Sequence, residues 1–127
     1  MTAYIYDAQL VLRDVDDGAE TSTVAEAAVA LDADKAGDFK AVIFVTAMDR
    51  TTGDEDCVFS IEADTASAFS TPVAVATLPA ITATGVYEIP LSAALIEKHE
   101  PGATHIRVKA TLDGETPSVT YGAYLVA

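Results

Sequence analysis

Two histidines and a single cysteine are the residues of this sequence best suited to metal binding or nucleophilic chemistry. Zinc sites use such side chains at short, regular spacings. His99 and His105 are separated by the turn-forming pair Pro101-Gly102, which does not match a helical metal pair, and Cys57 lies far from both along the chain. Cys57 shares one face of a predicted strand with Phe59 and Ile61, and the chain has no second cysteine to pair with it. We therefore expect a small buried side chain. We predict no zinc site and two ordinary histidines near a loop.

Two short acidic segments are candidates for calcium binding. The run Asp14–Gly18 is similar to the opening of an EF-hand loop, but its glycine comes too early and Glu26 is misplaced for the closing ligand. Asp54, Glu55 and Asp56 form a second run within a polar loop. We predict solvated loop acids at both places, and weak divalent cation binding at the second run stays open.

Motifs for catalysis are not found in the sequence. A nucleophile elbow G-x-S-x-G, a Ser or Cys placed with a His and an orienting acid, and the patterns G-x-G-x-x-G and G-x-x-x-x-G-K-[ST] are all missing. Twenty acidic residues always include carboxylate pairs, but no spacing favours any pair for glycoside hydrolysis. We therefore predict that the chain is not an enzyme and that it binds no cofactor.

Five tyrosines could stack on sugar rings, because an aromatic face packs on the apolar face of a pyranose. Tyr4 and Tyr6 share one face of a predicted strand, whereas Tyr121 and Tyr124 do not, and the chain has no tryptophan. The favoured interpretation places these side chains and Tyr87 at the rim of a β-sandwich with their hydroxyls in water. A carbohydrate-binding or adhesion module is kept as an alternative.

The charge of the chain is strongly negative and unevenly distributed. Twenty acidic and seven basic residues give a net charge of −13. Residues 1–64 carry fifteen acids against four bases, whereas residues 65–127 carry five against three. Such acidity opposes binding to phosphate backbones, so we expect no nucleic-acid partner. It favours solubility and repulsion between free subunits, and a saline environment is another explanation for it.

One window of the chain has no charge at all. From Thr65 to Tyr87, twenty-three residues carry no charged side chain, although 21% of all residues are charged. A surface built from this window could contact something other than water. Pro72, Pro79 and many Thr and Ser residues interrupt it. No window of the chain reaches the roughly 18 to 20 uninterrupted apolar residues of a membrane span. We expect no membrane partner.

Alternation of apolar and polar residues with a period of two dominates the sequence and predicts β-strands. Lys40–Met48 is the strongest of them, because it is apolar on both faces at its middle, as expected near the centre of a sandwich. The other strands that we expect are Ala3–Val15, the Ala-rich Val24–Leu31 (ambiguous with a helical turn), Cys57–Asp64, the edge strand Pro72–Leu78, Gly85–Leu91 ending at Pro90, Ile106–Asp113 and Val119–Leu125.

Turn residues between these strands predict how they are connected. The polar loop Asp49–Asp56 joins two strands as an antiparallel pair, and Asp113-Gly114 with Pro117 marks the turn of a second hairpin. Ser92 can cap one helical turn over Ala93–Lys98. Many short strands, regular turns and little helix predict an all-β fold, an antiparallel β-sandwich with at most one short helical turn.

The length and the N-terminus bound the organisation of the chain. With 127 residues, half of them hydrophobic, we predict one domain with one core, a single β-sandwich over residues 1–127. Met1–Asp7 lacks the basic and long apolar regions of a secretory signal. We expect a protein that is made and used inside a cell, or that leaves it by another route such as lysis.

The order of segments resembles the small jelly-roll cement, or head decoration, proteins of tailed bacteriophages. The resemblance spans most of the chain and rests on short, strand-like motifs. These are Tyr6-Asp7-Ala8-Gln9, Leu31-Asp32 before an acidic turn, Val42-Ile43-Phe44-Val45, Phe59-Ser60-Ile61-Glu62-Ala63-Asp64, a Ser/Thr/Ala segment, Leu78-Pro79, Ile89-Pro90-Leu91, His105-Ile106-Arg107-Val108, and the closing Gly-Ala-x-Leu-Val at 122–126.

The resemblance implies a jelly-roll-like sandwich on the outer surface of the phage capsid, and so a location in the virion. It implies a major capsid protein as partner, self-association as a homotrimer, stabilisation of the shell by non-covalent contacts, and no catalytic residues. The acidity and the Ala-rich segment Val24–Leu31 are not hallmarks of that family. Another β-sandwich virion component, such as a head fibre base or a tail protein, is the nearest alternative.

Two segments are candidates for contacts with the capsid or with other subunits. Both are uncharged or aromatic, and burial of such surface contributes affinity. The alternative, weighted at least equally, is that each segment is buried in the core of its own domain. The candidate contacts are Thr2, Tyr4 and Tyr6 near the N-terminus and Val73, Val75, Thr77, Leu78 and Thr82 in the uncharged window.

Overall fold

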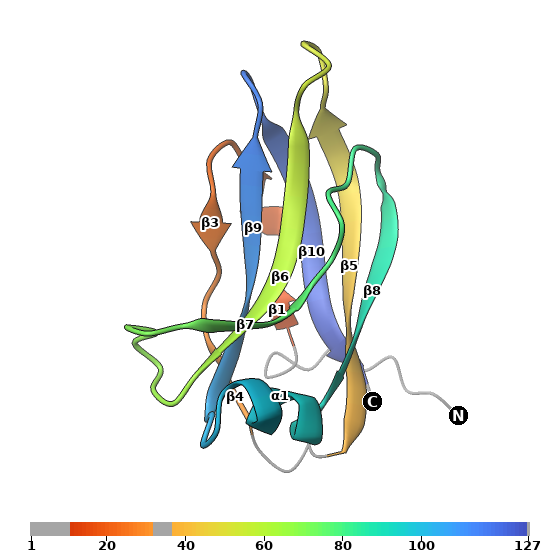
Figure 1. Ribbon diagram of the computed structural model, residues 1–127. Helices are drawn as coiled ribbons and strands as arrows, with labels where there is room; N and C mark the ends of the chain where they lie inside the picture. Colours follow the sequence, from red (N-terminus) through yellow and green to blue (C-terminus); the bar gives the residue numbers. More distant parts are fainter. Residues whose placement is uncertain (1–10, 32–36, 127) are drawn as a thin grey trace, which may run out of the picture.

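Two antiparallel β-sheets packed face to face form the fold in the computed structural model (Figure 1), which describes residues 11–31 and 37–126. The first sheet has the order β1-β10-β5-β8, with β2 paired to β10 beside β1. Its strands are β1 (Val11–Arg13), β2 (Ala19–Glu20), β5 (Asp38–Asp49), β8 (Gly85–Ser92) and β10 (Ser118–Val126).

The second sheet has the order β3-β9-β6-β7, with β4 paired to β9 beside β3. In Figure 1 this sheet lies in front of the first one. Its strands are β3 (Val24–Ala25), β4 (Val29–Ala30), β6 (Asp56–Asp64), β7 (Val73–Thr77) and β9 (His105–Asp113). The all-β sandwich predicted from the alternation is therefore confirmed, and the strand order is that of a jelly roll.

The connections between the longest strands differ from the prediction. β5 and β6 are joined by a loop as expected, but they lie in different sheets and do not pair. The predicted hairpin of β9 and β10 is also wrong, because β9 pairs with β6 and β10 pairs with β5. All four strands have a hydrogen-bonded neighbour on each side, so none of them needs the next strand in the chain as its partner.

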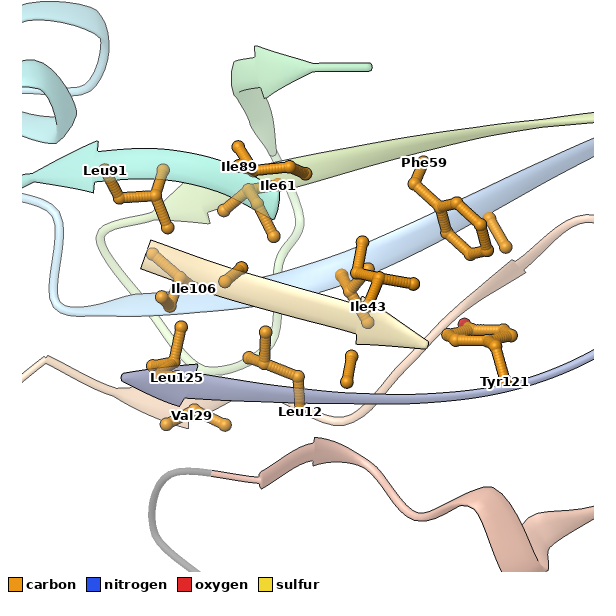
Figure 2. Packing of buried hydrophobic residues seen from close by; sticks show 14 of the residues in the cluster. Leu12, Val29, Ile43, Phe59, Ile61, Ile89, Leu91, Ile106, Tyr121 and Leu125 are labelled. Atoms are coloured by element: carbon orange, nitrogen blue, oxygen red, sulfur yellow. The ribbon is translucent and has the colours of Figure 1, made fainter. Parts of the chain in front are cut away.

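The core lies between the two sheets and is built from one face of every long strand. Figure 2 shows Ile43 of β5 and Tyr121 of β10 pointing toward side chains of the opposite sheet. The rings of Phe59 and Tyr121 meet edge to face across the core, with centroids 4.8 Å apart. In β5, Val42 is also buried, which agrees with the prediction that the middle of this strand is apolar on both faces.

Two short helical segments each follow a strand of the first sheet. α1 (Ala93–His99) begins at Ser92, whose Oγ accepts a hydrogen bond from the Leu95 N–H at 3.0 Å, and it ends before Pro101-Gly102, as predicted. A 3-10 turn, Val15–Asp17, follows β1 and was not predicted. Within residues 11–31 and 37–126, no helix has the length and apolar character needed to cross a membrane.

Several predicted strand boundaries change in the structure. Gly85–Leu91 continues through Pro90 to Ser92, because β8 is an edge strand and a missing N–H on its open side breaks no ladder bond. Val24–Leu31 is a strand segment interrupted after Ala25, which gives β3 and β4. Of Ala3–Val15, residues 11–13 form β1, and the part before residue 11 lies outside the described residues.

A buried arginine joins the two sheets on the side formed by β1 to β4. Arg13 is 3% exposed; its Nε donates to Glu26 Oε2 at 2.9 Å and its Nη2 donates to Glu20 Oε1 at 2.9 Å. Further N–H groups donate to the carbonyls of Gly18 and Tyr121. The Tyr121 ring lies 4.4 Å from the guanidinium carbon, and its hydroxyl donates to Glu26. Because Glu26 is held to β9 through Val108, this network links the first sheet to the second.

Charge pairing in this network outweighs the cost of burial. Burial alone would lower the pKa of Arg13, but the hydrogen bond to Glu20 and the charge of Glu26 raise it above the ordinary value. The pKa of Tyr121 is raised by burial and by the neighbouring Glu26 carboxylate. The tyrosine therefore stays a neutral donor, and the arginine stays a cation, over the whole physiological pH range.

Replacing Arg13 tests how much the sandwich depends on this network. Arg13→Met leaves Glu20 and Glu26 without their cation, and we expect the free energy of unfolding to fall by about 3–5 kcal/mol in urea denaturation. Lys40→Met is the matched control, because it breaks the exposed Lys40–Glu88 pair (2.6 Å) and should change stability by about 0–1 kcal/mol. Equal losses in the two variants would contradict a special role for Arg13.

Candidate functional site

The uncharged window Thr65–Tyr87 lies along the side of the sandwich opposite Arg13. It contains the loop after β6, the edge strand β7, the connection that crosses to the other sheet, and the start of the edge strand β8. Figure 1 shows β7 and β8 on this side, with the connection between them running up the flank of the molecule. The window is thus a margin of the sandwich at which both sheets present an edge strand.

The structure distributes the candidate contact residues of this window over different environments. Val75 is 5% exposed and packs in the core, so it has no surface to offer a partner in the folded protein. Val73 is half-buried, and Leu78 is half-buried against the core. Thr77 and Thr82 are exposed. The candidates Thr2, Tyr4 and Tyr6 lie outside the described residues.

A shallow hollow occupies the connection between β7 and β8. Its volume of about 340 Å³ is at the lower end of the range of small-molecule pockets. Its walls carry no charged side chain, and two of its lining residues are joined by a hydrogen bond from the Tyr87 hydroxyl to the Ala83 carbonyl at 2.7 Å. The lining residues are Leu78, Pro79, Ala80, Ile81, Thr82, Ala83 and Tyr87.

A second apolar feature, which we name the outer apolar cluster, lies on the outer face of the first sheet. It consists of Val42, Phe44, Val86 and Tyr124. Phe44 stands directly opposite Val86 across β5 and β8, and its ring centroid is 6.0 Å from that of Tyr124. Val86 is 68% exposed and Tyr124 37%, the two large hydrophobic side chains most exposed in the described part of the chain. Gly122 makes room for Phe44, because a Cβ there would lie 2.2 Å from Phe44 Cζ.

Val86 of the outer apolar cluster and Tyr87 of the hollow are consecutive residues of β8, so their side chains point to opposite faces of this edge strand, and the two features lie on either side of it. We name the exposed part of Thr77–Val86 together with this cluster the neutral surface. The nearest acid on the outer face, Glu88, is paired with Lys40 at 2.6 Å. The window was found from the sequence because it has no charge, whereas the outer apolar cluster was missed, since its four residues come from three strands.

The other candidate residues of the sequence form no reactive constellation in the described part of the chain. Burial raises the pKa of the Cys57 thiol to about 12, so the side chain is inert, as predicted. His99 is exposed at the end of α1, and His105 Nδ1 lies 2.8 Å from Thr104 Oγ1. Within residues 11–31 and 37–126, no group of three or more His, Cys, Asp or Glu side chains is arranged to hold a metal ion.

The acidic segments are integrated into turns. Asp14 accepts from the Asp16 N–H at 2.9 Å and thereby caps the 3-10 turn. In the loop between β5 and β6, Asp54 is exposed, as predicted, but Glu55 is completely buried. The burial of Glu55 corrects the expectation that the acids of this loop are solvated. The sequence gives no sign of this burial, because the residues on either side of Glu55 are also acidic.

The tyrosines do not form one stacking platform in the described residues. Tyr121 is completely buried and bonded to Glu26, so it departs from the expectation of a hydrated hydroxyl at the rim. Tyr87 is half-buried, and Tyr124 stands in the outer apolar cluster. No protein-family model matches the chain, and a search of curated proteins gives no match either. The fold and the neutral surface are the structural observations that bear on function.

Charge substitutions in the window separate core from surface. Val75→Asp places a carboxylate in the core, and we expect a loss of about 3 kcal/mol or more in stability because the charge has no partner there. Thr82→Asp, at an exposed position of the same window, should change stability by no more than about 0.5 kcal/mol. Thermal and urea unfolding of both variants measure this difference, and a folded, fully stable Val75→Asp protein would contradict the placement of β7.

The close approach of Phe44 to Gly122 can be tested by a double-mutant cycle. Gly122→Ala forces the Phe44 ring to move, and we expect a loss of about 1–3 kcal/mol. The same substitution in a Phe44→Ala background should cost much less, because the ring that it displaces is gone. Additive effects in urea denaturation would show that the two residues do not touch.

Proposed function

We propose that this chain is a virion structural protein, a capsid decoration protein that binds the outside of a phage head and stabilises the shell by non-covalent contacts. Its partner is the major capsid protein, and it acts as a homotrimer. The observation that carries the proposal is the neutral surface on an otherwise acidic sandwich. The jelly-roll strand order supports it, and so does the resemblance in the order of sequence segments.

Charge explains why a neutral surface is where such a protein would make contact. A net charge of −13 makes free copies repel one another and keeps them soluble. Contacts become favourable where acids are missing and apolar area is removed from water, at about 25 cal/mol per Å² before association costs are subtracted. The exposed side chains of Val86 and Tyr124, with Phe44 between them, provide such area.

The rest of the fold suits a role as a clamp. The core joins all the long strands of both sheets, and the buried Arg13 network holds the opposite side of the sandwich. A rigid body loses little conformational entropy on binding, so more of the gain from apolar burial appears as affinity. In this proposal the neutral surface faces the shell or a neighbouring copy, and the acidic surfaces face solvent.

Single charges on the neutral surface test the proposal. We expect Val86→Asp and Thr82→Asp to weaken binding to phage heads about tenfold or more without changing stability, since each buries a charge at the interface. Thr111→Asp, on the exposed outer face of the second sheet, is the matched control and should bind as the unmodified chain does. Co-sedimentation with heads of the encoding phage, stripped of decoration, measures the affinity.

The assembly and its location need separate measurements. Light scattering should give the mass of a trimer of the 13.2 kDa chain, and electron microscopy of the native particle should place the neutral surface against the shell or between subunits. A monomer that binds glycans and does not bind heads would overturn the proposal in favour of a carbohydrate-binding module. Equal loss of binding in Thr111→Asp would overturn the assignment of the surface alone.

A further inference from the structure

β8 is the longest strand that lies at an edge of either sheet. In the described part of the chain the first sheet ends on β8, which runs along one margin of the molecule in Figure 1. The edge strands β1 to β4 have only two or three residues each, and β7 has five residues with an irregular register against β6. β8 has eight residues in continuous register with β5. It is therefore the edge that another strand could most easily extend.

Two observations show which main-chain groups of β8 face the open side. The Ala93 N–H, directly after β8, donates to the carbonyl of Gly37, directly before β5, at 2.9 Å. Because the main-chain groups of a strand point alternately to its two sides, the odd-numbered residues of β8 also bond to β5. Pro90 agrees with this alternation, since its nitrogen has no hydrogen to donate to β5. The N–H and C=O groups of Val86 and Glu88 therefore point to the open side.

These main-chain groups have the arrangement to which an extended segment binds. Within residues 11–31 and 37–126, the backbone groups of Val86 and Glu88 make no bond to another strand, because β8 pairs with β5 alone. A row of unpaired N–H and C=O groups binds the main chain of an added strand, whatever the sequence of that strand. Gly85 begins this row, and Pro90 ends it because it has no N–H. We name Gly85–Ile89 the open edge.

The open edge lacks the features with which long edge strands are usually protected. Charged side chains, prolines and bulges are the common ones. The register between β8 and β5 contains no bulge, and the proline stands beyond the open edge, at residue 90. The one charged side chain of β8, Glu88, is neutralised by Lys40 at 2.6 Å. The open edge is thus neither bent away from an approaching strand nor charged against it.

We propose that the open edge receives an extended segment of the partner protein, which joins the first sheet as an additional strand beside β8. The partner is the major capsid protein, because this inference rests on the proposed function. Main-chain bonds to Val86 and Glu88 hold the segment, and the side chains on its two faces select it. The neutral surface then binds its partner by continuing a sheet, in addition to burying apolar area.

The surroundings of the open edge define the chemistry of the segment. On the outer face, a side chain beside Val86 would lie next to the outer apolar cluster, which favours an apolar residue. On the other face, Tyr87 borders the hollow with its uncharged walls, which favours a second apolar residue. Glu88 and the net charge of −13 favour lysine or arginine over acids. The segment is therefore apolar on both faces, and any charge that it carries is basic.

Hydrogen exchange of the unmodified chain, free and bound to stripped phage heads, tests the added strand. The bound chain is exchanged on the heads, and single amides are then read by fragmentation mass spectrometry. We expect the Val86 and Glu88 amides to exchange about tenfold or more slowly in the bound state, because each gains a hydrogen bond. The Tyr87 and Ile89 amides, which already bond to β5, should change much less. This alternation is specific to an added strand, and its measurement needs no variant.

Proline substitution on the open side separates main-chain bonding from side-chain contact. Val86→Pro removes the outward N–H, keeps an apolar side chain and breaks no bond to β5, as at Pro90. Val86→Ala is the matched control, because it keeps the N–H and loses most of the apolar side chain. We expect Val86→Pro to bind stripped heads about tenfold more weakly than Val86→Ala. Urea denaturation shows whether Val86→Pro folds, and Glu88→Pro against Glu88→Gln repeats the comparison at the other donor.

The outcomes distinguish the added strand from the proposed function. Binding to heads without slower exchange at Val86 and Glu88, or weaker binding of Val86→Ala than of Val86→Pro, would overturn the added strand and leave the proposed function in place. No binding of the unmodified chain to heads would overturn both. Strong protection of these two amides in the free chain would also overturn the proposal, because the edge would then already be filled by this chain or by a second copy.

Discussion

The buried guanidinium of Arg13 is the interaction on which one whole side of this sandwich depends. β2, β3 and β4 on this side are only two residues long, so their ladder bonds alone hold that side weakly. Arg13 adds bonds to Glu20, to Glu26 and to two backbone carbonyls, and it lies against the Tyr121 ring in the core. Because a buried cation without partners is far costlier than an exposed one, these groups must stay together for the fold to persist. The two sheets are thereby joined by charge where apolar area is small.

The opposite side of the sandwich carries the uncharged window, and charged residues hold that window only from its border, where buried Asp64 accepts from the Thr71 N–H at 3.0 Å and Arg107 lies 4.3 Å from the Phe69 ring. There β7 and β8 are edge strands, and prolines and small uncharged side chains surround them. Proline and short strands discourage uncontrolled pairing of edges. What remains exposed is the neutral surface, including the outer apolar cluster around Phe44. An acidic protein with one neutral side has a preferred direction of contact, and this asymmetry is the physical basis of the proposed role on a capsid.

Much of the fold could be predicted because alternation has a direct physical cause. Successive side chains of a strand point to opposite faces, so Cys57, Phe59 and Ile61 had to share one face, and the structure buries all three. Partner choice has no such local signature. The loop after β5 was interpreted as joining a strand pair, although it carries the chain to the other sheet. Tyr121, Arg13 and Glu55 were missed for the same reason: each is buried by residues far away in sequence, and a polar residue alone does not reveal which of its neighbours will cover it.

The sequence by itself determined the long strands, the helical turn capped by Ser92, the apolar core face and the uncharged window, since each depends on residues that are close along the chain. Only the tertiary structure decided which sheet each strand joins, that Val75 faces the core while Thr82 faces solvent, and that Phe44, Val86 and Tyr124 meet on one outer face. It also decided that Glu55 is enclosed by the turn between β9 and β10, which packs on it at Gly114. These outcomes depend on contacts between strands from distant parts of the chain, and such contacts exist only once the two sheets have packed together.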